Sequence, residues 1–363
     1  MAPSLPSLAS IASILTLVPS VLAGFSSSAT SNIAVYWGQN SAGGASTQSR
    51  LKEYCTDNGI NVINISFLVS IKTPSVNFAS ASDKCTAISG TSLLKCPEIE
   101  DDIKYCQGQG KTIMLSIGGA TYTEGGFSDS ASAIASANTV WGLFGSSTGT
   151  ANRPFGSAVV DGFDFDFEST TSNFVPFASQ LRSLMDADSS KTYYLSAAPQ
   201  CVYPDAAMND MLNGAISFNW INIQFYNNFC GVINFSNPNA WNFNVWDDWA
   251  HKTSKNPNVK VLIGVPANTG AGGGYVAAPT LGSIISDTKG KYSSFGGIMM
   301  WDMSQLYANS GFLTSVRSSL GAGGSAPTTT LTTSTRTTST TTPGQTGVVA
   351  QWGQYVPPFS FLR

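Results

Sequence analysis

The chain has 363 residues, a formal net charge of −3 and 11% charged side chains, against roughly 25% in an average soluble domain. No basic patch stands out, which argues against nucleic acid as a partner. The single histidine, His251, excludes a multi-histidine metal site, and no G-x-S-x-G or equivalent nucleophile motif lies near it. We therefore expect a solvated surface histidine, no metal and no cofactor.

Residues 1–23 have the pattern of a secretory signal peptide, with a short apolar core from Ile11 to Leu17 and the small-residue exit Val21-Leu22-Ala23. Pro19 interrupts the stretch, which is also too poor in strongly apolar residues for a membrane span. We expect a secreted, extracellular protein that does not cross a membrane, and leave association with a cell wall open.

In an oxidising compartment, the six cysteines are expected to form three disulfides. No C-x-x-C pair occurs, which argues against zinc binding and thioredoxin-like chemistry, and the spacing alone leaves fifteen connectivities. The cysteines are Cys55, Cys85, Cys96, Cys106, Cys201 and Cys230.

Between residues 24 and 321, short apolar runs alternate with longer segments that leave room for helices. This pattern favours parallel strands covered by helices, in an α/β fold with a single (β/α)8 TIM barrel. The alternative, a doubly wound open sheet, needs a glycine-rich phosphate loop after the first strand. Trp37-Gly38-Gln39-Asn40 is not such a loop, and we expect Gly272-Gly273-Gly274 to be a bent loop. The predicted strands are Ile33–Trp37, Val62–Val69, Thr112–Ile117, Ala158–Phe167, Thr192–Ala197, Trp220–Tyr226, Val259–Val265 and Gly297–Trp301.

The composition changes beyond this region. Residues 322–347 are dominated by Ser, Thr and Pro, which predicts a solvated, O-glycosylated linker that builds no core. The final segment, 348–363, resembles the opening of a small fungal cellulose-binding module. A module of that size needs cysteine pairs to fold, and this segment has none. We expect a truncated remnant in a disordered tail, without binding activity.

The fourth predicted strand carries a row of acids. With a side-chain period of two, Asp164, Asp166 and Glu168 point to one face, and phenylalanines point to the other. Successive acids lie about 6.5–7 Å apart, and burying three of them without a function would be costly. The row therefore indicates acid catalysis. A calcium loop and an inert relic of a catalytic row are the alternatives. The intervening aromatic residues, with no glycine after Gly162, argue for a strand over a wrapped loop.

In a TIM barrel the chemistry lies where the strands end. Glu168 is then expected at the mouth of the barrel, with Asp166 and Asp164 progressively deeper. Aromatic and amide side chains at other strand ends indicate a carbohydrate site, because aromatic planes stack on sugars and amides bond hydroxyl groups. Each aromatic taken alone could instead be core packing. These strand ends carry Tyr36, Ser116-Ile117-Gly118-Gly119, Gln224-Phe225-Tyr226-Asn227 and Trp301-Asp302.

Several motifs together resemble glycoside hydrolase family 18. Its D-x-x-D-x-D-x-E signature is matched from Asp161 to Glu168, and its S-x-G-G motif from Ser116 to Gly119. Tyr36-Trp37-Gly38-Gln39-Asn40 and Gln224-Phe225-Tyr226-Asn227-Asn228 are similar to the plant-type, hevamine-like (class III) chitinases, which are also abundant in fungi. The resemblance covers about residues 30 to 315.

The resemblance implies a chitinase that cleaves β-1,4-linked N-acetylglucosamine with retention of configuration. We expect the enzyme to be endo-acting and monomeric. The substrate's own acetamido oxygen would be the nucleophile. Glu168 would be the general acid and base, Asp166 would orient the acetamido group, and Asp164 would share a proton with Asp166. Tyr226 would hold the acetamido carbonyl, supported by Gln224 and Asn227. The pocket would have Trp301 as its floor and Tyr36, Phe67 and Gly119 along its sides, with Asp161, Ser116 and Gly118 as structural parts of the motifs.

The same resemblance implies the disulfides Cys55–Cys106, Cys85–Cys96 and Cys201–Cys230. Two other functions stay open. One is an endo-β-N-acetylglucosaminidase that acts on N-glycans, and the other is a non-catalytic chitin-binding lectin or inhibitor on the same barrel. The presence of both Glu168 and Asp166 favours an active enzyme.

Overall fold

The computed structural model describes residues 24–44, 46–147 and 149–321. The expected signal peptide (1–23), linker (322–347) and module remnant (348–363) lie outside these residues. Within the described part, no helix combines the length and apolar character that a bilayer crossing requires.

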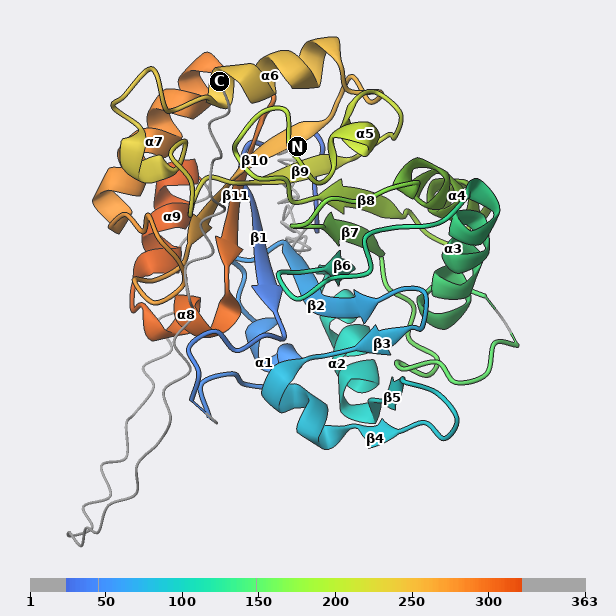
Figure 1. The fold of residues 1–363 in the computed structure, drawn as a ribbon. Coiled ribbons are helices and arrows are strands. Elements are labelled where there is room, and N and C mark those ends of the chain that lie inside the picture. Colours follow the sequence, from blue (N-terminus) through green and yellow to red (C-terminus); the bar gives the residue numbers. More distant parts are fainter. Residues whose placement is uncertain (1–23, 45, 148, 322–363) are drawn as a thin grey trace, which may run out of the picture. The chain divides into compact units, whose positions relative to one another are not determined.

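Eight parallel strands form a closed barrel, because β11 pairs with β1 and β1 also pairs with β2. The predicted TIM barrel is therefore confirmed, and the open doubly wound sheet was wrong. Figure 1 shows the strands ringed by helices. In order around the barrel, the strands are β1 (Asn32–Trp37), β2 (Val62–Ser70), β6 (Thr112–Gly118), β7 (Gly162–Asp166), β8 (Tyr194–Ala197), β9 (Trp220–Gln224), β10 (Lys260–Pro266) and β11 (Phe295–Trp301).

Each predicted strand overlaps one of these, but the fourth was predicted too long at both ends. Residues 158–161 form a loop, in which the Val160 N–H bonds the carbonyl of Phe144. Asp161 closes this loop, since its carboxylate accepts hydrogen bonds from the Ile113 N–H at 2.8 Å and from Lys191 Nζ at 2.8 Å. These contacts fix where β7 begins.

Helices lie between successive strands of the barrel. Several have sequence-encoded ends: Asp129 and Ser132 form a capping box at the start of α3, and Gly321, with φ 78°, ends α9. The helices are α1 (Leu51–Tyr54), α2 (Pro97–Gly108), α3 (Ser130–Phe144), α4 (Phe174–Ala187), α5 (Asn209–Leu212), α6 (Phe243–Lys252), α7 (Ala278–Lys291), α8 (Met303–Ala308) and α9 (Phe312–Leu320). Short additions to the barrel are β3 (Ser75–Val76), which pairs antiparallel with β2, the hairpin of β4 (Thr86–Ala87) and β5 (Leu94–Lys95), and the 3-10 turns η1 (Ala79–Lys84) and η2 (Val232–Asn234).

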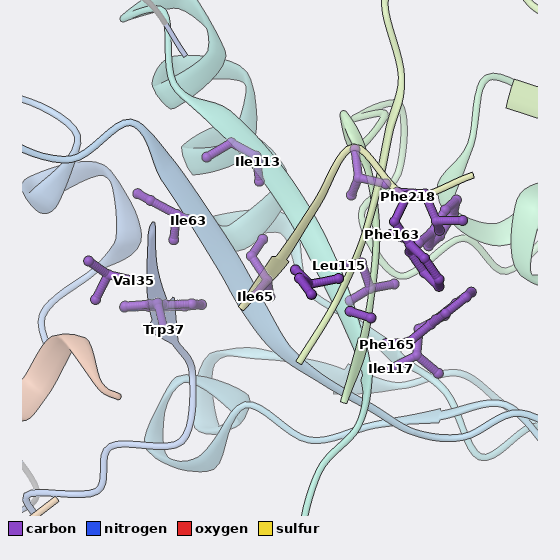
Figure 2. Packing of buried hydrophobic residues seen from close by; sticks show 14 of the residues in the cluster. Val35, Trp37, Ile63, Ile65, Ile113, Leu115, Ile117, Phe163, Phe165 and Phe218 are labelled. Carbon is purple, nitrogen blue, oxygen red and sulfur yellow. The ribbon is translucent and has the colours of Figure 1, made fainter. Parts of the chain in front are cut away.

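The strands separate two apolar layers. The outer layer, between strands and helices, includes Ile63, Leu115, Phe163 and Phe165, which are fully buried (Figure 2). Residues of opposite parity, such as Met114, belong to a second cluster with side chains of other strands inside the barrel. The alternation predicted for the fourth strand is thus present, and it directs the acids of β7 into the lumen.

All three disulfides implied by the family resemblance are confirmed. Cys55–Cys106 joins the end of α1 to α2, and Cys85–Cys96 brackets the β4–β5 hairpin. Cys201–Cys230 joins the loop after β8 to the loop after β9, at the carboxyl-terminal end of the strands.

Candidate active site

The acid row runs from the barrel lumen to its mouth. Asp164 is fully buried, Asp166 is 3% exposed, and Glu168 is exposed to solvent. The strand itself ends at Asp166, one residue before the predicted end at Phe167, so Glu168 lies two residues beyond it. The side chain at the mouth is therefore accessible, while its two partners are shielded from water.

Asp164 is held by donors from four different strands. Its Oδ2 accepts from Tyr36 Oη at 2.7 Å and Ser116 Oγ at 2.8 Å, and its Oδ1 from Ser196 Oγ at 2.6 Å and Asn222 Nδ2 at 3.3 Å. Burial raises the pKa of Asp164, and these hydrogen bonds oppose that rise. The net result is a raised pKa, and the four donors limit the rise.

Asp166 has a different environment. Its Oδ1 accepts from Gln224 Nε2 at 2.9 Å, and the same nitrogen also bonds the Ala198 carbonyl at 3.0 Å. Burial, followed by the charges of Glu168 and Asp164, raises the pKa of Asp166 well above its usual value. Asp166 is therefore suited to carry a proton when its neighbours are ionised.

Glu168 also binds protons more tightly than an ordinary glutamate. Partial withdrawal of its carboxyl from water into the mouth of the barrel raises its pKa, a hydrogen bond with Gln224 opposes the rise, and the charge of Asp205 adds to it. Asp166 and Glu168 also repel each other as anions, so we expect these two groups to titrate together. From the sequence we had expected Asp164 and Asp166 to be the two groups that titrate together.

Asp205 is a buried acid that we did not predict as a site residue from the sequence. Its carboxylate accepts the backbone N–H groups of Gln200 at 2.9 Å, Ala207 at 2.9 Å and Met208 at 2.7 Å, which shapes the loop after β8. The sequence feature that could have pointed to Asp205 is the pair Pro204-Asp205 after the fifth predicted strand. By itself this pair indicates only a turn. Ser196 and Asn222 were also missed, although each is a polar residue of inward parity in an apolar strand.

Three aromatic side chains form a wall beside the acids. The ring centroids of Phe67 and Trp301 lie 5.9 Å apart with an interplanar angle of 17°, and Tyr36 lies 5.5 Å from Trp301. Gly119 packs against this wall, since an added Cβ would come within 2.8 Å of the Phe67 ring. Gly118 similarly allows close approach to β7, because its Cβ would lie 2.4 Å from the Asp166 carbonyl oxygen.

The two residues after Phe225 differ in their contacts. Tyr226 is 6% exposed, and burial together with the charges of Asp166 and Glu168 raises its pKa well above the usual value, so its phenol remains a donor. Asn227 instead bonds the loop after β10: its Oδ1 accepts the Gly273 N–H at 2.7 Å, and its own N–H bonds the Gly273 carbonyl at 2.8 Å. Asn227 therefore braces a neighbouring loop.

No group of three His, Cys, Asp or Glu side chains that could hold a metal ion occurs among the described residues. His251 is exposed on α6, where it contacts Ser293 Oγ at 3.0 Å, as expected for a surface histidine. The barrel mouth thus carries an accessible carboxyl above a shielded one, beside an aromatic wall. Such a combination is typical of enzymes that hydrolyse glycosidic bonds.

Comparison with known proteins agrees with this class. The sequence profile of glycosyl hydrolases family 18 matches residues 32–275, and the chain belongs to this family. It is 55% identical over 313 residues to Endochitinase 33 of Trichoderma harzianum, covering 84% of this chain and 97% of that protein. The resemblance found in the sequence is therefore confirmed.

Two solved plant structures share the fold. A chitinase from Ipomoea carnea aligns with a TM-score of 0.65 and 28% identity, covering 79% of this chain and 99% of the plant chain. A xylanase and alpha-amylase inhibitor protein from Scadoxus multiflorus aligns with a TM-score of 0.65 and 30% identity, covering 79% and 98%. The same barrel is thus found in a protein named as an enzyme and in one named as an inhibitor.

Proposed function

We propose that the protein is a secreted, monomeric, endo-acting chitinase that hydrolyses β-1,4 linkages between N-acetylglucosamine units with retention of configuration. The observation that carries this proposal is the exposed Glu168 above the buried Asp166, whose Oδ1 is held by Gln224. The 55% identity to a protein named as an endochitinase supports chitin as the substrate. The predicted signal segment and the three disulfides support secretion.

In the first step, protonated Glu168 donates its proton to the glycosidic oxygen while the acetamido oxygen of the substrate attacks the anomeric carbon. The glycosidic bond breaks, the shortened chain leaves with the proton, and a cyclic oxazolinium ion remains. Asp166 accepts a hydrogen bond from the acetamido N–H and offsets the positive charge. The Tyr226 hydroxyl donates to the acetamido oxygen and fixes its direction of attack.

In the second step, ionised Glu168 takes a proton from a water molecule, whose oxygen attacks the anomeric carbon from the face that the leaving group occupied. The oxazolinium ring opens, the acetamido group is restored, and the product keeps the β configuration. Asp164 stays ionised beside its four donors and does not contact the substrate. Trp301 serves as the floor of the sugar pocket, with Tyr36, Phe67 and Gly119 along its sides.

The inhibitor from Scadoxus multiflorus makes a non-catalytic barrel the second candidate. In this chain both Glu168 and Asp166 are present, Asp164 accepts hydrogen bonds from four donors, and Gln224 donates to Asp166. That arrangement serves proton transfer, whereas binding alone would not require it. An enzyme that cleaves N-glycans could use the same acid row. Assays on chitin oligomers and on a glycoprotein distinguish this activity from that of a chitinase.

The test is the variant Glu168→Gln. Loss of the general acid is expected to lower hydrolysis of a soluble chitin oligomer by about 10²–10⁴-fold, while folding and chitin binding persist. The anomer of the first wild-type product, followed by NMR, is expected to be β. Near-normal turnover by Glu168→Gln, or release of the α anomer by the wild type, would contradict the proposal.

A further inference from the structure

Two segments of the chain have the N-x-S/T pattern that accepts N-linked glycans in secreted proteins. They are Asn64-Ile65-Ser66 and Asn234-Phe235-Ser236, and the sequence contains no third. An N-linked glycan is bulky and hydrophilic, so the asparagine that carries it has to lie where the sugars can extend into solvent. The folded positions of Asn64 and Asn234 therefore decide which of them can be modified.

Asn64 has no room for a glycan. It lies in β2, where its Cα pairs with Tyr36 of β1 on one side and with Met114 of β6 on the other. Val62, two residues earlier, belongs to the apolar cluster inside the barrel, so Asn64 faces the lumen as well. The residue is fully buried, and neither polar atom of its side chain reaches solvent. A sugar on this nitrogen would prevent closure of the barrel, so a folded chain carries none there.

Asn234 lies in a different environment. It is the last residue of η2, in the loop after β9, and Ser236 and Asn237, which follow it, are exposed. Its side-chain nitrogen Nδ2 donates to the Phe229 carbonyl at 2.8 Å, and this hydrogen bond lies at the protein surface. A sugar attached to this nitrogen can therefore extend into solvent while the loop keeps its conformation.

Among the described residues, the two most exposed large hydrophobic side chains flank Asn234. Phe229 and Ile233 are each 61% exposed, whereas the others of this kind are 46% exposed or less. Ile233 precedes Asn234 in the chain, and Phe229 supplies the carbonyl that accepts the hydrogen bond from Asn234 Nδ2. Two such groups beside one asparagine indicate a surface that a ligand covers.

The loop that carries Asn234 is fixed to the barrel. The disulfide Cys201–Cys230 anchors it to the loop after β8, and Cys230 is fully buried. The Val232 N–H bonds the Phe225 carbonyl at 2.8 Å. A glycan on Asn234 would thus start from a fixed point and bury apolar surface without the entropic cost of ordering the loop.

We propose that Asn234 carries an N-linked glycan whose first N-acetylglucosamine covers Phe229 and Ile233, and that Asn64 carries none; the inference rests on the proposed secretion. The donor is an oligosaccharide joined through a diphosphate to a membrane lipid. The bond between its anomeric carbon and the phosphate oxygen breaks, a bond from that carbon to Asn234 Nδ2 forms, and a proton of this nitrogen leaves with the lipid diphosphate. The apolar C–H face of the attached sugar then removes the two exposed side chains from water.

The first experiment locates the glycan. The full chain, including residues 1–23, is produced in a yeast that secretes it, and the protein in the medium is treated with peptide-N-glycosidase F in heavy-oxygen water. This treatment converts each glycosylated asparagine into an aspartate that carries heavy oxygen, and it leaves O-linked sugars in place. Mass spectrometry of proteolytic fragments is expected to find the label at Asn234 and none at Asn64.

Ser236→Ala and Ser236→Thr are the matched pair of variants. Both keep Asn234 and its hydrogen bond to Phe229, but only the threonine preserves the acceptor pattern. The loss of mass that peptide-N-glycosidase F causes is expected to disappear in Ser236→Ala and to persist in Ser236→Thr.

The second experiment tests whether the sugar covers the apolar side chains. Removal of the glycan by Ser236→Ala should delay elution from a hydrophobic-interaction column. The delay is expected to be larger in the wild-type background than in the double variant Phe229→Ala/Ile233→Ala, where little apolar surface remains to be uncovered. Equal delays in the two backgrounds would overturn the covering role of the sugar.

The outcomes separate this inference from the proposed function. A chain that stays inside the cells with residues 1–23 attached defeats the proposed secretion, and this inference with it. Secreted protein without the label at Asn234, or with the label at Asn64, overturns this inference alone. Hydrolysis of chitin oligomers is measured on the same secreted protein and decides the chitinase function independently of the label.

Discussion

Removal of the Tyr36 hydroxyl tests whether Asp164 is an ionised group inside the barrel. Tyr36→Phe deletes one of the four hydrogen bonds to this fully buried carboxylate and adds no volume. A hydrogen bond to a charged group contributes about 1.5–3 kcal/mol, and no water replaces it at a fully buried site. We therefore expect Tyr36→Phe to lower the free energy of unfolding by about 2–3 kcal/mol at neutral pH.

The loss should depend on pH. The Tyr36 O–H favours the charged form of Asp164, so its removal raises the already raised pKa of Asp164 further. The missing stability is then greatest at pH values where Asp164 is ionised. As the pH falls through that pKa, Asp164 becomes neutral, and the loss should shrink toward the ~1 kcal/mol of a neutral hydrogen bond.

The measurement is urea denaturation of wild type and variant at several pH values. Tyr193→Phe is the matched control, because Tyr193 Oη also donates to an aspartate, Asp188 Oδ2, at 2.7 Å, but there the carboxylate is partly exposed. We expect its loss to be smaller than that of Tyr36→Phe. Equal losses in the two variants, or a Tyr36→Phe loss that does not change with pH, would refute an ionised Asp164.

Two further predictions concern the mouth of the barrel. Because the charge of Asp205 helps to raise the pKa of Glu168, Asp205→Asn should move the alkaline limb of the kcat/KM profile to lower pH; a limb that stays in place or moves upward would contradict this. Gly119→Ala should raise KM and lower the midpoint of thermal unfolding, because its Cβ would meet the Phe67 ring at 2.8 Å. The control Gly43→Ala has nearly the same φ, +79° against +81°, but nothing within 4 Å of the added Cβ, so equal effects in both variants would attribute the loss to backbone strain alone.

Local periodicity was enough to predict the acid row, because a strand alternates its side chains whatever its neighbours are. Asp164 and Asp166, and Phe163 and Phe165 beside them, therefore took the expected faces, and the eight apolar runs predicted the barrel. The ends of the fourth strand were less predictable. Residues 158–161 have the apolar character of a strand, but Asp161 anchors them in a loop through Ile113 and Lys191.

The partners of each carboxyl could not be predicted, because they come from distant strands. Asp164 bonds Ser196 and Asn222, which are 32 and 58 residues away, and only closure of the barrel brings them together. The assignment of Asn227 to the substrate came from the family resemblance, whereas its contacts go to Gly273.

The opposite faces of β7 serve two separate needs, burial of phenyl rings under the helices and presentation of carboxyls to the lumen. Loss of one residue at the start of this strand would exchange the two faces, placing acids among the helices and rings inside the barrel. Such a chain could not fold, so a shift in register cannot produce an intact barrel without catalysis. Replacement of an individual acid can, because it removes the chemistry and leaves the scaffold available for a binding role.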